Sequence, residues 1–270
     1  MSWVRLHPKP EIILFGNAQG TADICRELGL RHIPEVECNE FGTPLVDDLF
    51  QKAQRLANYD LICYINADIV VTQSLIEAIN IISQRWKRFV VSCSTWDLSM
   101  EKAIDFNFPD WQGQLRDLVQ KKANAPLSIG MDLFLFPRGF YHDIPPFLLG
   151  RKAWDNWLIF KACAGRIPFI DTSEFMLIVH LQHEKSTHCS SYLEDTEEMQ
   201  LNERLAGWWP GTFIGRDVPY KLGKDGRLQK RSVFKLLSYR LQAIRSHSFI
   251  CRLCGGISYF LRKLGVLSNQ

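Results

Sequence analysis

Two apolar runs joined by a short polar tip constrain the fold of this chain more than any other feature. Residues 61–65 and 69–71 are rich in strand-forming residues, and Asn66, Ala67 and Asp68 stand between them. A buried strand that delivers an amide and a carboxylate to its carboxyl end is typical of open α/β sheets, which place ligand chemistry at that edge. The tip therefore predicts an α/β fold with a site at its centre.

This tip has two interpretations when it is taken alone. Hard divalent cations bind oxygen ligands and keep coordination positions for phosphate and water, so Asn66 and Asp68 could hold a cation together with a diphosphate. Alternatively, Asp68 closes a turn between two elements. A tripeptide alone favours the turn, because short motifs often match by chance. The rest of the chain has to decide between the two.

Strand and helix patterns alternate along the first half of the chain. With 270 residues and 46% hydrophobic content, the chain can bury one substantial core. The apolar pattern predicts strands at residues 10–16, 32–36, 61–66 and 89–94, and helices at residues 21–29, 43–58 and 73–84. With right-handed crossovers, these elements predict an α/β fold whose sheet is mostly parallel and flanked by helices.

Two further carboxylates stand at predicted element ends. Residues 129–138 alternate in the manner of a strand, with Asp132 near its start. Asp155 lies at or just inside the first turn of a helix predicted over residues 157–164. Free N–H groups and the helix dipole stabilise a carboxylate there. By itself, Asp155 is better explained as a helix cap.

Histidines cluster after a predicted buried strand at residues 175–181. His180, His183 and His188 fall within nine residues of one another. The spacing of the first two lets one bind a metal while the other orients it or contacts phosphate. An isolated histidine is more often a core residue, but three after one strand indicate a site.

Five short elements follow one another between residues 7 and 190. They are N-x-x-G-T-P at 39–44, Y-I-N-A-D-I at 64–69, G-x-D-x-F-x-F-P-R at 130–138, G-R-x-x-W-D-N-W-L at 150–158 and H-x-x-H at 180–183. Together they resemble the GT-A-type nucleotide-diphospho-sugar transferases, in particular a glycosyltransferase family 2-like group. The resemblance implies a GT-A-like fold and transfer of sugar from a nucleotide-diphospho-sugar to a glycan or lipid-linked acceptor.

The resemblance also implies roles for the tip and the histidines. Asn66 and Asp68 stand where the family has its Asp-x-Asp-like element. Asp68 is then expected to bind Mn²⁺ or Mg²⁺, and Asn66 to contact the ribose or sugar of the donor. His180 or His183 is expected to complete the metal shell. Which of the two does so stays open, because Glu-Lys follows His183 where the family has Asp-Tyr.

The catalytic base and the cleft lining follow from the same resemblance. Asp155 stands where inverting members place the carboxylate that deprotonates the acceptor hydroxyl. A positioned carboxylate can do this without an unusual pKa, provided that the acceptor oxygen reaches hydrogen-bond distance. Asp132 and Arg151 are expected to line the donor or acceptor cleft.

A catalytically inactive GT-A-like binding protein is the alternative. Related sequences begin with an additional strand and helix that help to hold the nucleotide, and this chain starts in the segment that would follow them. Loss of that strand motivates the alternative. A nucleotidyltransferase is a more distant hypothesis, disfavoured because no Gly-rich phosphate loop with a following Lys is visible.

Charge is divided unevenly along the chain. Residues 221–270 contain eleven Lys or Arg and one acidic residue, whereas residues 1–220 have seven more acidic than basic residues. This asymmetry predicts a boundary near residue 220. It separates the GT-A-like domain that the resemblance implies at 1–220 from a basic amphipathic helical tail at 221–270. The tail can contact an anionic membrane surface through residues 231–267 or pack against the acidic domain, and both interpretations stay open. Nucleic acid is not expected, because no binding motif accompanies the charge.

We expect a cytoplasmic protein, peripheral at the inner face of the membrane if the tail binds lipid. The first residues contain no apolar stretch of signal-peptide length, and no window reaches the ~18 uncharged apolar residues of a membrane-spanning helix. The eight cysteines have no regular spacing and predict no disulfide framework. Cys251 and Cys254 form only a weak zinc or redox signal.

Overall fold

A computed structural model of the chain describes residues 2–100, 103–123, 131–181, 196–207 and 213–232. The helices are η1 (Trp3–Arg5), α1 (Thr21–Leu28), α2 (Val46–Leu56), α3 (Ser74–Ser83), α4 (Trp111–Lys122), α5 (Trp154–Ala164), α6 (Glu197–Leu205) and η3 (Gly215–Asp217). The strands are β1 (Ile13–Phe15), β2 (Arg31–Ile33), β3 (Leu61–Ile65), β4 (Ile69–Val71), β5 (Val90–Ser92), β6 (Trp96–Leu98), β7 (Leu133–Pro137), β8 (Phe169–Asp171), β9 (Ile178–Leu181), β10 (Tyr220–Leu222) and β11 (Leu228–Lys230). The predicted α/β class is confirmed.

The large sheet is mixed, which corrects the prediction of a mostly parallel sheet. Its strand order is β11-β10-β8-β5-β7-β3, and β7 runs antiparallel to both of its neighbours, β3 and β5. The pairs β5–β8 and β8–β10 are parallel. Between β5 and β7 the chain forms β6 and α4, which belong to another part of the fold. The right-handed crossover rule applies to single βαβ units and therefore does not set the direction of β7.

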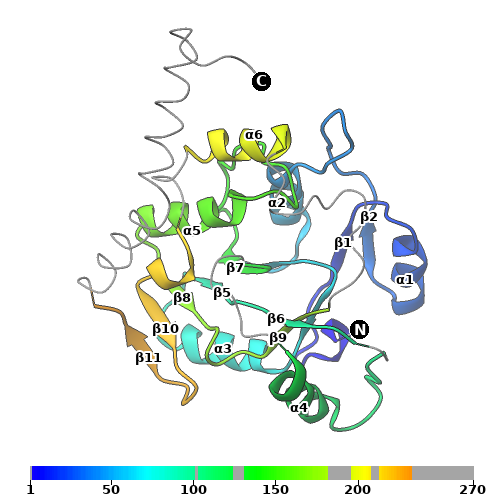
Figure 1. Cartoon of the computed structure of the whole chain (residues 1–270), viewed down its shortest axis with the longest axis vertical. Helices are drawn as coiled ribbons and strands as arrows, with labels where there is room; N and C mark the ends of the chain where they lie inside the picture. The colour runs from blue at the N-terminus through cyan, green and yellow to red at the C-terminus, as the bar shows by residue number, and fades with distance from the viewer. Residues whose placement is uncertain (1, 101–102, 124–130, 182–195, 208–212, 233–270) are drawn as a thin grey trace, which may run out of the picture. The chain divides into compact units, whose positions relative to one another are not determined.

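Successive side chains of β7 point to opposite faces, so this strand separates two hydrophobic cores. Phe134 and Phe136 join the core formed with α2 and α5. Leu133 and Leu135 join the core formed with α3. Figure 1 shows α2 and α5 on one side of the strands and α3 on the other. Burial on both faces explains why the sequence of β7 is apolar throughout.

A second sheet contains β4, β9 and β6 in that order. Strand β9 is antiparallel to β4 and parallel to β6. Ile69 and Val71 face the core that contains α3, whereas Val70 and Val179 face α4. The polar tip at residues 66–68 is therefore the point where the chain passes from the large sheet to the small one.

The first two strands form a sheet of their own. Strands β1 and β2 are parallel, with α1 between them in sequence. Glu11, before β1, accepts hydrogen bonds from the backbone N–H and the side-chain amide of Asn58, which lies between α2 and β3, each at 2.7 Å. Strand β3 stands at one end of the large sheet, and its pairing partner among the described strands is β7.

The amino-terminal turn η1 covers the outer edge of β4. The Trp3 indole N–H donates to the carbonyl of Ile69 at 2.8 Å, and the backbone N–H of Val71 donates to the Ser2 hydroxyl at 3.1 Å. These are backbone groups that a neighbouring strand would otherwise pair with. The contacts fix the start of β4 directly after Asp68.

Strands β10 and β11 extend the fold beyond the domain boundary that we expected at residue 220. The compact unit runs to Lys230, because both strands join the large sheet. The predicted tail helices and the segment 231–267 lie almost entirely outside the described residues, as do Cys251 and Cys254. None of the described helices is long and apolar enough to cross a membrane.

Candidate functional site

Asn66 and Asp132 meet because β3 and β7 are antiparallel, which brings the end of one strand beside the start of the other. The Asn66 backbone N–H donates to the Asp132 carbonyl at 3.2 Å, and its side-chain amide donates to the Asp132 carboxylate at 2.9 Å. The Tyr64 hydroxyl donates to the Asn66 amide oxygen at 2.6 Å. The Thr95 hydroxyl donates to the other carboxylate oxygen of Asp132 at 2.7 Å. Both side chains are thus fixed in orientation.

His180 lies between the carboxylates of Asp68 and Asp97. The register of the small sheet causes this, since His180 pairs with Ile69 of β4 and with Asp97 of β6. Nε2 is 3.3 Å from Asp68 Oδ2, and Nδ1 is 2.8 Å from Asp97 Oδ1. The hydrogen bond to Asp68 raises the pKa of His180 to about 9; partial burial opposes this shift and Asp97 adds to it. The imidazole is therefore a cation at neutral pH.

The described residues do not complete the expected Mn²⁺ or Mg²⁺ site. No group of three or more His, Cys, Asp or Glu side chains within them is placed to hold a metal ion. His183, the other expected ligand, lies outside the part of the chain that the structure describes. A metal ion bound by Asp68 and His180 would have to displace the imidazolium proton, because only a neutral imidazole is a ligand.

Asp155 lies in the first turn of α5, as predicted, although the helix begins three residues earlier than expected. Its side chain is buried and accepts a hydrogen bond at 3.1 Å from the backbone N–H of Met131, the residue before Asp132. Burial raises the pKa of Asp155 to about 6, and the charge of Asp132 adds to this shift, whereas backbone hydrogen bonds oppose it. The carboxyl group is mostly ionised at pH 7.

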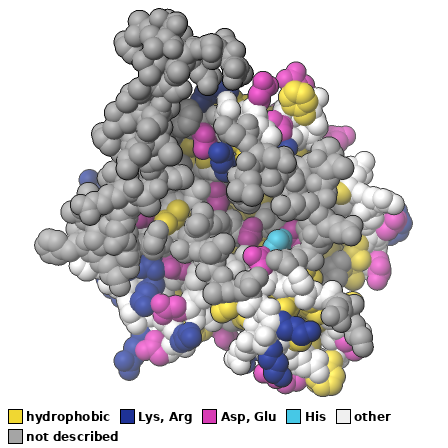
Figure 2. Space-filling view, viewed as in Figure 1, with side chains coloured by type: hydrophobic (Ala, Val, Ile, Leu, Met, Phe, Trp, Pro, Cys, Tyr) yellow, Lys and Arg dark blue, Asp and Glu magenta, His cyan; other side chains and the backbone are white. Residues whose placement is uncertain are grey.

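The charges of three carboxylates, those of Asp68, Asp132 and Asp155, act on the phenol of Tyr64. Burial raises the pKa of the Tyr64 hydroxyl, and the charges of all three carboxylates raise it further. Burial also raises the pKa of Asp132. Figure 2 shows acidic side chains beside a histidine near the centre of the face that is in view. The residues that the sequence placed in separate elements therefore form one acidic site.

Arg151 contacts Glu198 of α6. Its Nε and Nη2 atoms donate to Glu198 Oε2 at 2.9 and 2.6 Å. The other carboxylate oxygen accepts from the Asn39 amide at 2.7 Å and from the Thr43 hydroxyl at 2.8 Å. Arg151 is 7% exposed, so most of its guanidinium serves this buried network. Its expected role in lining the cleft stays a prediction.

Sequence reasoning missed three residues of the site, namely Tyr64, Thr95 and Asp97. Tyr64 was part of a recognised element but received no role. Thr95 directly follows the strand predicted at residues 89–94, and Asp97 lies two residues further along, in β6. Polar residues at a strand end were the signal that singled out Asn66 and Asp68, and the same signal was available for this strand.

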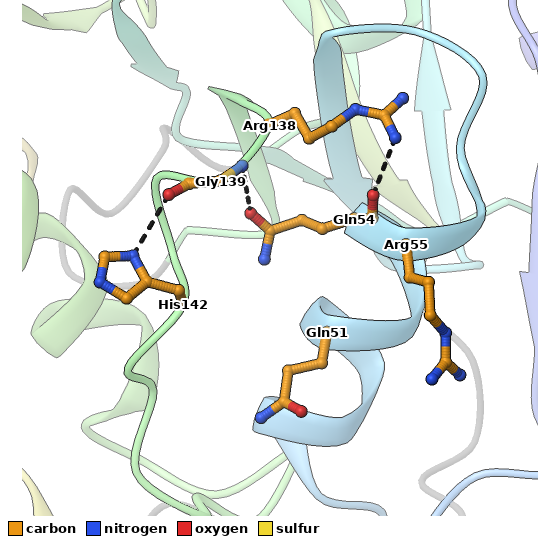
Figure 3. A pocket seen from close by; sticks show the side chains of 6 residues that line it. All are labelled: Gln51, Gln54, Arg55, Arg138, Gly139 and His142. Atoms are coloured by element: carbon orange, nitrogen blue, oxygen red, sulfur yellow. Dashed lines mark hydrogen bonds between the residues drawn. The ribbon is translucent and has the colours of Figure 1, made fainter.

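A separate hollow of about 450 Å³ lies between α2 and the turn after β7. It is lined by Gln51, Gln54, Arg55, Arg138, Gly139 and His142. Arg138 Nη1 donates to the carbonyl of Gln54 at 3.0 Å, and the Gln54 side-chain oxygen accepts from the backbone N–H of Gly139 at 2.9 Å (Figure 3). These contacts tie α2 to the turn, and none of the predicted site residues lines the hollow.

Comparison of this chain with protein-family models, with curated proteins and with solved structures finds no match. The functional assignment therefore depends on the geometry and chemistry of the acidic site.

Proposed function

We propose that the protein is a GT-A-type, metal-dependent glycosyltransferase that transfers a sugar, with inversion, from a nucleotide-diphospho-sugar to a glycan or lipid-linked acceptor. One observation carries the proposal. Asn66, Asp68, Asp132 and Asp155 come from three separate stretches of the chain. Asn66 bonds to both Tyr64 and Asp132, and the charges of all three carboxylates act on Tyr64. Such a set of fixed amide and carboxylate groups suits recognition of sugar hydroxyls and of a cation-bound diphosphate.

Asp155 is the proposed base. Its buried carboxylate has a pKa of about 6, near the pH at which it would work, and this favours general-base catalysis. In the proposed step, Asp155 takes the proton of the acceptor hydroxyl while that oxygen bonds to the anomeric carbon. The bond from the anomeric carbon to the diphosphate breaks in the same step, and the nucleoside diphosphate leaves with the bonding electron pair.

Asn66 and Asp132 are proposed to orient the donor. Each is held by two partners, so neither has to be reorganised when a ligand binds. The proposed metal, Mn²⁺ or Mg²⁺, would be held by Asp68 with His180 or His183 and would stabilise the charge of the leaving diphosphate.

The second candidate is a catalytically inactive GT-A-like binding protein. Two observations favour it. The described part of β1 and β2 forms a sheet separate from the one that ends in β3, and the imidazolium of His180 lies beside Asp68, where the cation is proposed.

Calorimetric titration with UDP and with GDP, each with and without Mn²⁺, tests the proposal against this alternative. The transferase predicts metal-dependent affinity for at least one of these nucleotides, weakened by Asp68→Ala. Absence of metal-dependent affinity for both would favour the inactive protein. Asp23→Ala, which removes an exposed carboxylate on α1, is the matched control.

A further inference from the structure

Helix α6 holds the loop that leads into α5. It does so through three polar side chains, Glu198, Asn202 and Glu203. We propose that Glu198 and Asn202 are positioning residues for Asp155, acting through the loop at residues 148–153, which they lock in one conformation. The inference rests on the proposed function for the role of Asp155 as a base. The contacts of Glu198 and Asn202 with the loop do not depend on that function.

Glu198 is the first point of attachment. Its carboxylate accepts four hydrogen bonds, two from Arg151 and one each from Asn39 and Thr43. Burial opposes ionisation of Glu198, yet these hydrogen bonds, with Arg151 first among them, lower its pKa below the usual value. An ionised carboxylate therefore links α6 to Arg151 within the loop and to the segment before α2.

Asn202 is the second point, one helical turn further along α6. It is fully buried, and its amide oxygen accepts from the Leu148 backbone N–H at 2.8 Å. Its amide nitrogen donates to the carbonyls of Leu148 and Lys152 at 2.9 and 3.1 Å. The side chain thus satisfies three backbone groups of the loop, and shortening it would leave them buried without these partners. Glu203 adds an ion pair with the Lys152 side chain at 3.1 Å.

The locked loop ends at a strained residue. Ala153 has φ 82° and ψ −23°, a left-handed conformation that residues with a Cβ rarely adopt. Such a conformation persists only when the surrounding contacts hold it in place. Residues with this kind of strain are frequent at functional sites. Ala153 stands between Lys152, which Asn202 binds, and Trp154, the first residue of α5. The conformation of Ala153 sets the direction in which α5 leaves the loop and hence the place of Asp155.

A purely structural role for α6 makes a different prediction. Met199 of α6 and Ala206, which follows the helix directly, are buried, so the helix also contributes to stability by packing. If packing were its whole role, any destabilising substitution in α6 would lower stability and leave Asp155 unaffected in the folded protein. A positioning role predicts a change in the titration midpoint of Asp155 that loss of packing alone does not produce.

The test compares Glu198→Gln and Asn202→Asp in the full chain with two controls on the same helix. Glu197→Gln makes the same chemical change at an exposed position, and Met199→Ala removes a buried apolar side chain from the same helix. The first readout is the titration of Asp155 by carboxyl-carbon NMR, assigned with Asp155→Asn. It needs no activity. The second readout is kcat and KM for sugar transfer.

We expect Glu198→Gln and Asn202→Asp to lower the Asp155 midpoint from about 6 toward its usual value, because a loosened loop admits water to the buried carboxyl group. The same variants should reduce kcat by roughly tenfold to a hundredfold with a smaller change in KM. Both controls should leave the midpoint in place. An unchanged midpoint in folded Glu198→Gln and Asn202→Asp, or an equal shift in Met199→Ala, would overturn the inference. A shifted midpoint in a protein without transferase activity would uphold the positioning and reject the proposed function.

Discussion

Nε2 of His180 lies 3.3 Å from Oδ2 of Asp68, so a cationic side chain of the chain itself compensates the carboxylate at the polar tip. The contact exists because β4 and β9 pair with Ile69 opposite His180. It links two sequence elements that lie more than a hundred residues apart. It also determines how the site should respond to pH and to metal ions.

Stability should fall at alkaline pH because of this contact. The pKa of His180 is about 9 in the folded protein and 6.5 in an unperturbed imidazole. Because the pKa is raised on folding, the contribution of protonated His180 to stability is fully present below about pH 6.5 and is lost as pH rises through about 9. Urea unfolding of the wild type and of His180→Gln between pH 6 and 10 measures this. The free energy of unfolding of the variant should change less with pH than that of the wild type. An equal change with pH in the two proteins would refute the expectation.

Binding of Mn²⁺ should release a proton if His180 becomes a ligand. The imidazolium must lose its proton first, so affinity should rise with pH between 6 and 9. Calorimetry in buffers with different ionisation enthalpies counts the protons released. His180→Gln should abolish the release. A proton count near zero in the wild type would show that the metal ion, if bound, does not use His180.

Asp155→Asn should stabilise the protein at neutral pH and abolish sugar transfer. Burial raises the carboxyl pKa from 3.8 to about 6, so the wild type loses stability as pH rises from about 4 to 6 and the cost then stays constant. Removing the charge should therefore raise the free energy of unfolding at pH 7 by as much as about 3 kcal/mol, since each pKa unit corresponds to about 1.4 kcal/mol. Urea unfolding at pH 4 and pH 7 tests this. A variant that is less stable than the wild type at pH 7 would contradict it.

Asn66→Asp should destabilise the fold by about 1–3 kcal/mol, because it replaces a donor to Asp132 with a second carboxylate. Thermal or urea unfolding measures the loss. The exposed Asn17→Asp introduces the same charge away from the site and is the control. The destabilisation should shrink at low pH, where the carboxylates are protonated. An effect equal to that of Asn17→Asp would show that the contact with Asp132 is unimportant.

Local sequence patterns predicted the elements that carry the site, and long-range pairing decided the rest. The apolar runs around residues 66–68 predicted the strand end that the structure has as β3, because burial on both faces leaves a clear signal. Asp155 was predicted in a first helical turn because polar residues at helix starts also leave a local signal.

The antiparallel insertion of β7 could not be predicted, because its apolar sequence has the same pattern in either direction. The contact of Asp97 with His180 depends on a register between residues 83 positions apart. Likewise, the burial of Arg151 follows from Glu198, which lies 47 positions further along the chain. None of these pairings has a signature within a single stretch of sequence.

The most direct measurement is the release of nucleoside diphosphate from a panel of UDP- and GDP-sugars with Mn²⁺, in the presence and absence of candidate glycan and lipid-linked acceptors. A transferase with the proposed site should show turnover in the wild type and in Asp23→Asn, and none in Asp68→Ala or Asp155→Asn, with all variants folded. Turnover that is unchanged in Asp68→Ala or in Asp155→Asn would contradict the proposed function.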